Sequence, residues 1–489
     1  MSAYRDLGKL LLGSAVVKLF GIAATLVFVR VLTKTEMAVF PIYFMLRYVS
    51  AQLLDFGITP YLIRVLPSTL REGRESARSL LFTAVPIVFA GLAVVTTLTF
   101  LFSDRVAELV LQDHSAGWMV RIICLGFFPY TVTKISEYVI WGRAQFATLS
   151  FLQTLEAFVR PVVIVSFYVL FGLPGVVAAF VLVEVFLAAV YVYCIRDLIG
   201  GSRPPAYPAR QLLAASFPLY VDGYLWYLRS GGDNWLVSIF LGPIALSEYY
   251  VAGIMVNQVT MLFASVDKVV MERLGRHMDK PESLAEKALE VHATVTRFVL
   301  PGILWLLALT PLAIIVIAGP AYSASVAPAI VLMLVALAQF LFMPVDRSVF
   351  VGTPTRFRLF KTAIEATVVL AGSALLAPLV GSAGIAGGRL AGETAGGFFG
   401  LAVLRRRLKL MLPFDEVLRA FLTAAPGTIL VLWFMPPVSG TVEAIVAAAV
   451  ASAAWLALFL VLVFFFNRPL LDALPAEIRR AMGRNPKPA

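Results

Sequence analysis

The sequence predicts an all-α polytopic membrane protein with about fourteen transmembrane helices. Of its 489 residues, 60% are hydrophobic and 14% are charged, whereas soluble domains average about half apolar and a quarter charged residues. Apolar stretches close to the roughly 20 residues that a helix needs to cross about 30 Å of hydrocarbon recur along the whole chain. These observations leave no segment long enough for a soluble catalytic domain.

The predicted spans are separated by very short loops on one side and by longer polar segments on the other. The short loops include GLPG at 172–175 and GSAG at 381–384, and the polar segments include residues 196–211 and 272–297. The spans are expected at residues 10–31, 37–60, 79–102, 119–141, 149–172, 174–195, 212–241, 248–270, 295–318, 327–350, 361–380, 384–404, 421–436 and 442–466.

The basic residues predict how these spans are oriented. With the N-terminus inside, most of the 40 Lys and Arg residues fall in cytoplasmic segments, where such residues are retained. The N-terminus and the C-terminus are then both inside, and the protein is expected in the cell membrane. The net charge of +11 indicates an affinity for anionic membrane lipids, and we do not interpret it as nucleic-acid binding.

A weak internal repeat predicts two similar lobes. The stretch VRVLTKTEMAVFPIY, residues 29–43, aligns with SIFLGPIALSEYYVA, residues 238–252. An even number of predicted spans separates the copies, so they are parallel, as in transporters with two lobes around a central cavity. We therefore expect an N-lobe at 1–200 with spans 1–6 and a C-lobe at 201–404 with spans 7–12. Two extra spans follow at 405–466, and a cytoplasmic tail at 467–489.

The sequence offers no signature of catalysis or of metal binding. No GxxxxGK[ST] motif is present to hold ATP phosphates on backbone amides. Cys124 and Cys194 both fall within predicted spans and do not suggest a disulfide or a zinc site. We therefore expect a transporter and not an enzyme, with no catalytic residue, no metal site and no cofactor.

Three charges inside the seventh predicted span indicate a polar environment there. Asp222, Arg229 and Asp233 lie in the stretch VDGYLWYLRSGGDNWL, and each charge facing mid-bilayer lipid would cost roughly 2.5–3.5 kcal/mol. Together with Trp226 they follow one another at intervals of 4, 3 and 4 residues, which places all four on one helix face. Gly231 and Gly232 interrupt this face and predict a kink or an unwound turn.

Two interpretations of this stripe stay open. In the first, Arg229 contacts a lipid phosphate or diphosphate, while Asp222 and Asp233 bind a coupling cation or sugar hydroxyls. In the second, Arg229 bridges the two aspartates and locks the packing of the helix.

The opening of the chain resembles a known family. An arginine and a leucine end the first span, a short turn and an aromatic-rich second span follow, and then DFG at 55–57 precedes a basic residue. The segment DNWLVSIFLGPIALSEYYVAG, from residue 233, has a similar pattern at the start of the second lobe. Both resemble the polysaccharide-transporter (oligosaccharide flippase) branch of the multidrug, oligosaccharidyl-lipid and polysaccharide (MOP) exporter superfamily. The turn LTKTE, residues 32–36, departs from the glycine-containing turn usual there.

The resemblance implies a flippase for a polyprenyl-(di)phosphate-linked oligosaccharide in cell-surface polysaccharide or glycan biosynthesis, with glycosyltransferases or a polymerase of the same pathway as partners. In the lipid II flippase branch, the first span carries basic cavity residues, and VKLFG resembles the SRxLG pattern there, which matches Lys18 to the first of them. Lys18 could equally extend to the cytoplasmic interface. For Arg47 we favour the same basic cavity over an ion pair with an acid from another helix.

The charged residues of the other predicted spans differ in whether an oppositely charged residue lies nearby in the sequence. Asp55, Glu184 and Glu365 have no oppositely charged neighbour that we identify, so they are candidates for coupling to Na⁺ or H⁺. Local pairs at helical spacing are expected to be structural: Lys134 with Glu137, Glu156 with Arg160, and Arg389 with Glu393.

Two alternative functions remain. A multidrug and toxin extrusion (MATE) type exporter of organic cations would need a net acidic cavity, against which Lys18, Arg47 and Arg229 argue. A membrane glycosyltransferase or polymerase would need acidic residues on a sizeable outer loop, and the loop after the first span offers only Glu36.

Overall fold

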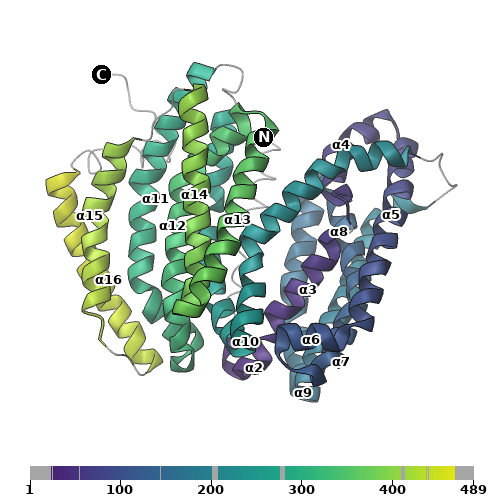
Figure 1. Ribbon diagram of the computed structural model, residues 1–489, viewed down its shortest axis with the longest axis horizontal. Helices are drawn as coiled ribbons and strands as arrows, with labels where there is room; N and C mark the ends of the chain where they lie inside the picture. The colour runs from purple at the N-terminus through teal and green to yellow at the C-terminus, as the bar shows by residue number, and fades with distance from the viewer. Residues whose placement is uncertain are drawn as a thin grey trace. The chain divides into compact units, whose positions relative to one another are not determined.

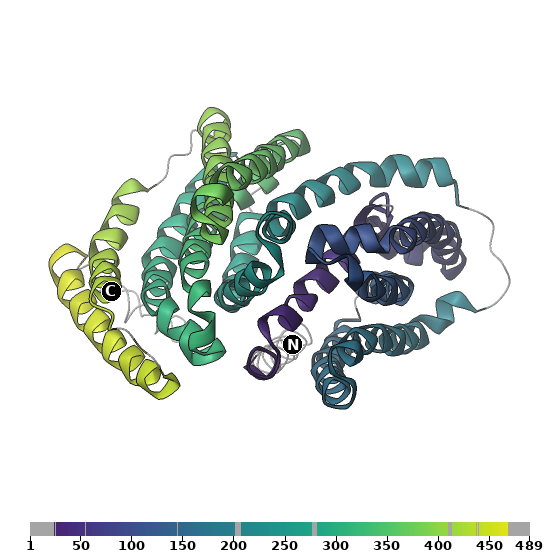
Figure 2. The same cartoon turned by 60° about the horizontal axis from the view of Figure 1, so that its bottom comes forward.

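The computed structural model describes residues 24, 26–53, 55–143, 145–200, 207–275, 281–408, 413–436, 438 and 440–467, so Lys18 lies outside the described residues. These residues form helices and their connections, with no strand among them (Figures 1 and 2). The chain divides into two compact units, Met1–Ser247 and Glu248–Ala489. The predicted lobe boundary at residue 200 stays a prediction, and each unit is described by itself.

The first unit contains α2 (Lys34–Met37), α3 (Val39–Leu53), α4 (Ile58–Glu72), α5 (Arg74–Leu101), α6 (Ser103–Leu111), η1 (His114–Ala116), α7 (Gly117–Leu125), α8 (Phe127–Gly142) and α9 (Phe146–Ile199). Helix α10 (Ala209–Gly275) leads from the first unit into the second. The second unit continues with α11 (Pro281–Ala318), η2 (Pro320–Ser325), α12 (Val326–Gly352), α13 (Thr355–Val380), α14 (Ser382–Leu408), α15 (Phe414–Trp433) and α16 (Thr441–Phe466).

Two helices are too long for one membrane crossing, and both bend at a glycine. Helix α9 has 54 residues and α10 has 67, whereas about 20 suffice to cross the hydrocarbon. The backbone leaves helical geometry at Gly172, with φ 63°, and at Gly242, with φ 84°, a region that glycine enters without strain. Both bends fall at the ends of predicted spans, so each long helix contains two of them.

Every predicted span from 37–60 onward overlaps a helix or half of a bent helix. Among the described residues, nine helices are long and apolar enough to cross a membrane, and α9 and α10 each count once among them. The number of crossings and the inside location of both termini stay predictions.

The predicted kink at Gly231 and Gly232 is wrong, because α10 is helical through both residues. A Cβ at Gly231 would lie 2.9 Å from the Tyr227 ring. The glycine therefore makes room for an aromatic side chain on the same helix. Helix α10 leaves helical geometry at Gly242 instead, which lies in the predicted loop between the spans 212–241 and 248–270.

The turn LTKTE forms a capping box without needing a glycine. The Thr33 backbone N–H donates to Glu36 Oε2 at 2.9 Å, and the Glu36 N–H donates to Thr33 Oγ1 at 3.3 Å. These reciprocal bonds satisfy two donors at the start of α2. They provide a physical reason why this turn departs from the family pattern.

In the first unit, α4, α5, α8 and α9 enclose an apolar core. Helix α4 contributes Ile58, Leu62 and Leu66 at intervals of four residues, and each is at most 1% exposed. Tyr191 of α9 packs into the same core and is 1% exposed. This core fixes the positions of the helices that carry the charged residues described below.

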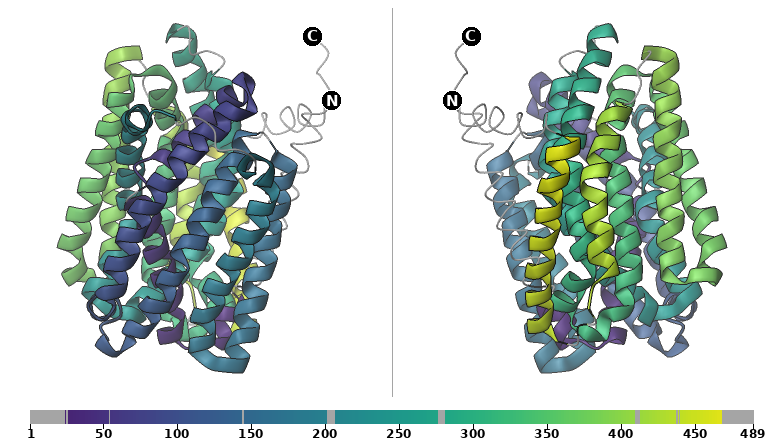
Figure 3. Two further views of the ribbon diagram at one scale, coloured as in Figure 1. Left: turned by 90° about the vertical axis from the view of Figure 1, so that its right-hand side faces the viewer. Right: turned by 90° about the vertical axis from the view of Figure 1, so that its left-hand side faces the viewer.

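In the second unit, a glycine-rich face of α14 packs against α13, and the two helices lie side by side (Figure 1). A Cβ at Gly388 would lie 2.2 Å from the Ser373 backbone nitrogen, and one at Gly392 would lie 2.4 Å from Val369. Small residues four apart allow two helices to approach this closely. Figure 3 shows α16, in yellow, beside the yellow-green α15, where Trp455 donates to Thr428 at 3.1 Å.

Candidate functional site

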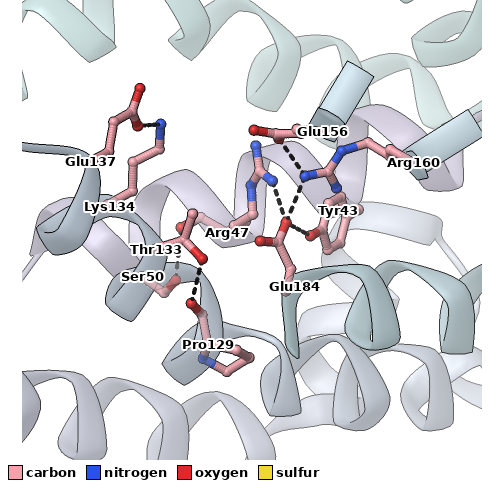
Figure 4. Close-up of polar contacts among 10 residues, drawn as sticks. All are labelled: Tyr43, Arg47, Ser50, Pro129, Thr133, Lys134, Glu137, Glu156, Arg160 and Glu184. Atoms are coloured by element: carbon pink, nitrogen blue, oxygen red, sulfur yellow. Dashed lines mark hydrogen bonds and ion pairs between the residues drawn. The ribbon is translucent and has the colours of Figure 1, made fainter. Parts of the chain in front are cut away.

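In the first unit, one carboxylate oxygen on the second half of α9 accepts three hydrogen bonds (Figure 4). Glu184 Oε1 accepts from the Tyr43 hydroxyl at 2.6 Å and from an Arg47 terminal nitrogen at 2.6 Å. It also accepts from an Arg160 terminal nitrogen at 3.1 Å. Two cations from two different helices, α3 and α9, therefore meet at one atom.

Burial makes this contact costly to break. The Glu184 side chain is 1% exposed, while those of Arg47 and Arg160 are 15% and 13% exposed. A buried charge is tolerated only when paired and hydrogen-bonded. The second Glu184 oxygen, Oε2, is buried without a hydrogen-bond partner among the described residues, as is one terminal nitrogen of Arg160.

Further charged side chains from α8 and α9 surround this contact. Glu156 Oε1 accepts from Arg160 at 2.6 Å, and Glu137 accepts from Lys134 at 2.6 Å and from Gln153 at 3.1 Å. The predicted local pairs of Lys134 with Glu137 and of Glu156 with Arg160 are thus confirmed. We call the following set the α3–α8–α9 charge cluster: Arg47, Lys134, Glu137, Glu156, Arg160 and Glu184.

Aromatic rings hold the Arg47 guanidinium in place. Its central carbon lies 4.2 Å from the centre of the Tyr130 ring, 5.1 Å from that of Tyr43 and 5.0 Å from that of Phe44. A cation within about 6 Å of a ring centre is attracted by the negative face of the ring. The Tyr43 ring stacks in turn on Phe180 at 4.0 Å.

The residue after Arg47 connects the cluster to the predicted stripe on α10. The Tyr48 ring stacks on Tyr227 at 4.3 Å and lies 6.3 Å from the Trp226 ring. Trp235 fixes the Tyr227 hydroxyl by donating to it at 2.7 Å. Trp226 is 47% exposed. Trp226 therefore lies beside Tyr48, the residue that follows the predicted site residue Arg47 on α3.

The charged residues of the α10 stripe differ in burial. Asp222 and Arg229 are half-buried, whereas Asp233 is fully buried and accepts a hydrogen bond from the Asn234 N–H at 3.0 Å. Both interpretations of Arg229, contact with a ligand phosphate or bridging of the two aspartates, stay predictions.

Two of the ion-coupling candidates have local partners that the sequence reading overlooked. Asp55 Oδ1 accepts from the Thr59 N–H at 2.9 Å and from the Thr59 hydroxyl at 2.5 Å. Glu365 accepts from Lys361, which also contacts Asp346 at 3.1 Å. Thr59 lies four residues after Asp55, and Lys361 lies four residues before Glu365. This spacing is visible in the sequence. The view of Glu365 as an acid without a charged neighbour was therefore wrong.

Arg47 and Glu184 form the ion pair that we considered less favourable for Arg47. The sequence reading did not identify Tyr43 as a member of this site, and it treated Arg160 as part of a local pair only. Glu184 has no oppositely charged residue within four positions in the sequence. This was the signal that could have revealed the site, because a buried acid without a local partner requires one from elsewhere.

A model of the polysaccharide biosynthesis protein family matches residues 27–327, a range that includes the whole α3–α8–α9 charge cluster. The chain belongs to this family. No curated protein matches the chain. The sequence-based assignment to the polysaccharide-transporter branch is thereby confirmed.

Solved structures confirm the predicted fold. Lipid II flippase MurJ, in an inward closed conformation, is similar with a TM-score of 0.76 and 13% identity over 94% of this chain and 99% of that one. An inward-facing multidrug resistance MATE family transporter of the MOP superfamily has a TM-score of 0.62 and 13% identity over 80% and 94%. An outward-facing MATE structure has a TM-score of 0.57 and 15% identity over 82% and 94%. The chain has the multi-pass helical fold of MOP transporters.

Proposed function

We propose that this protein is a flippase that moves a polyprenyl-(di)phosphate-linked oligosaccharide from the cytoplasmic to the outer leaflet by alternating access. Membership of the polysaccharide biosynthesis family and the fold shared with a lipid II flippase support this proposal. The observation that carries it is the convergence of Arg47 and Arg160 on one anionic oxygen.

That convergence suits a phosphate. A guanidinium presents five N–H donors in a planar fork that matches phosphate oxygens. Within the described part of the chain, Arg47 uses a single terminal nitrogen for hydrogen bonding. A phosphate oxygen in the place of Glu184 Oε1 would therefore receive both arginines, and the unused donors would reach its other oxygens.

Glu184 then acts as the counter-ion of the two arginines before the lipid binds. It keeps the two guanidiniums close together without a ligand, and a phosphate has to displace it. Competition from Glu184 weakens phosphate binding. The lipid can then be released on the other side of the membrane, as transport requires. Coupling to H⁺ or Na⁺, through Glu184 or elsewhere, is part of the same proposal.

Partly exposed aromatic rings on α3 and α10 suit a sugar. Tyr48, the residue after Arg47, and Trp226 are both partly exposed, and their ring centres lie 6.3 Å apart. Aromatic side chains combine an apolar face with hydrogen-bonding ability. The head group of the proposed substrate likewise combines an anion with sugars.

The MATE fold similarity keeps export of organic cations as the alternative. A cation site needs an available acid, whereas Glu184 already accepts from two arginines and a tyrosine. The geometry therefore favours an anionic substrate.

The test is leaflet translocation in proteoliposomes that contain the purified protein and a fluorescent polyprenyl-diphosphate sugar. The labelled lipid is added to one side of the membrane. We expect it to reach the other side only in vesicles that contain the protein. Transport of organic cations without movement of the lipid would overturn the proposal. Release of free sugar would instead indicate an enzyme.

A further inference from the structure

An apolar cavity of about 330 Å³ lies between α5, α8 and the end of α9 in the first unit. Its wall includes Phe82 and Val85 of α5, Val132 and Ser136 of α8, and Ile195 and Ile199 of α9. The volume falls within the roughly 300–1,000 Å³ of ligand-binding pockets. The cavity is formed by other side chains than the α3–α8–α9 charge cluster.

The cavity is confined to a short part of the helices. Its lining residues on α5 run from Leu81 to Phe89, about 12 Å at 1.5 Å per residue, whereas the hydrocarbon is about 30 Å thick. Phe82 and Ile199 are 37% and 45% exposed, so the cavity reaches the surface of the unit. A chain bound here stays within one leaflet.

Basic side chains gather at the end of the same helices. Asp197, between two lining residues of α9, accepts from Arg143 at 2.8 and 3.1 Å and contacts Arg74 at 3.1 Å. One carboxylate thus joins two cations, which leaves a net positive charge. The Arg78 guanidinium lies 5.7 Å from the Phe82 ring centre, at the rim of the cavity.

We propose that this cavity binds one acyl chain of an anionic glycerophospholipid, with the lipid phosphate beside Arg74 and Arg143. An apolar cavity next to a net positive helix end complements a molecule with an apolar chain and an anionic head. The prenyl tail of the proposed substrate fits less well, because that lipid changes leaflets while the cavity occupies one. The bound lipid would brace the ends of α5, α8 and α9, which Asp197 already connects.

Photo-crosslinking tests this proposal directly. A benzophenone amino acid at position 82 is placed in the protein, which is then reconstituted in vesicles of phosphatidylcholine and phosphatidylglycerol in equal amounts. We expect the captured adduct, identified by mass, to be at least fivefold enriched in phosphatidylglycerol. The matched control is position 151, an exposed phenylalanine of α9 that does not line the cavity, where no preference is expected.

The substitution R143Q should reduce the preference at position 82 to less than half, while R105Q, at an exposed arginine of α6, should leave it unchanged. Equal capture of both lipids, or no adduct at position 82, would overturn the proposal. An adduct with a prenyl chain from co-reconstituted polyprenyl phosphate, in excess of phosphatidylglycerol, would assign the cavity to the substrate tail and equally overturn it. None of these readouts depends on flippase activity.

Discussion

Arg47 and Arg160 lie on different helices, yet both donate to the same oxygen atom, Oε1 of Glu184, at 2.6 and 3.1 Å. Two guanidiniums repel each other, and the repulsion is strong where water is largely excluded. The buried carboxylate makes their proximity possible. In the proposed function, an anionic ligand replaces it.

Removal of the Glu184 charge should destabilise the first unit. E184Q leaves two partly buried arginines without their shared counter-ion, and the loss of one partner of a buried pair costs about 3–5 kcal/mol. Thermal unfolding of the purified protein measures the change. E108Q is the control, because Glu108 forms an exposed pair with Arg105 that contributes about 0–1 kcal/mol. Equal melting temperatures for the two variants would contradict a structural dependence on Glu184.

The half-exposed Trp226 should affect ligand binding more than stability. Substitution W226A removes a half-exposed ring beside Tyr48, and contacts made by aromatic rings contribute on the order of 1 kcal/mol. We expect a several-fold weaker apparent affinity for the lipid-linked sugar, with little change in melting temperature. W433A, at an 81% exposed tryptophan of α15, should change neither. A loss of stability without a loss of affinity would assign Trp226 to packing.

Asp55 should stabilise the start of α4. D55A removes both hydrogen bonds from Thr59 in the first turn of α4. The loss of a side-chain acceptor for a backbone N–H at a helix start costs about 0.5–2 kcal/mol. D55N retains an acceptor and should keep most of the stability and the ion dependence of transport. Folded D55N protein that has lost its dependence on Na⁺ or H⁺ would show that Asp55 couples the ion.

The close approach of α13 and α14 should not tolerate a side chain at Gly388. G388A places a methyl group against the Ser373 backbone, and overpacking of this kind costs about 1–3 kcal/mol. G302A is the matched control in the second unit. Among the described residues, no atom beyond the neighbouring backbone of its own helix lies within 4 Å of the added Cβ, and alanine favours the helix by up to about 1 kcal/mol. Comparable yields and melting temperatures for both variants would contradict the predicted packing.

The sequence predicted the positions of the helices better than the contacts between them. Apolar stretches of membrane length identify spans, and the bends at Gly172 and Gly242 coincide with predicted loops because glycine there allows a positive φ. The same rule failed at Gly231, where the missing Cβ makes room for the Tyr227 ring. Glycine serves both purposes, and only the neighbouring residues distinguish them.

The candidate site depends on contacts that sequence spacing does not encode. Arg47 and Glu184 are 137 residues apart, and helical periodicity cannot say which faces of α3 and α9 meet. By contrast, the pair of Lys361 and Glu365 follows from a spacing of four residues. Local pairs could therefore be predicted from the sequence, whereas the contact of Arg47 and Arg160 with Glu184 could not.

We propose that Arg47 and Arg160 bind the phosphate of a lipid-linked sugar. The most direct measurement is the initial rate of translocation of a fluorescent polyprenyl-diphosphate sugar in proteoliposomes with equal amounts of folded R47Q, R160Q and R105Q protein. We predict that R47Q and R160Q each lower the rate at least tenfold, the equivalent of about 1.4 kcal/mol, while R105Q keeps the rate of the unsubstituted protein. Folded R47Q and R160Q proteins with an unchanged rate would contradict the account.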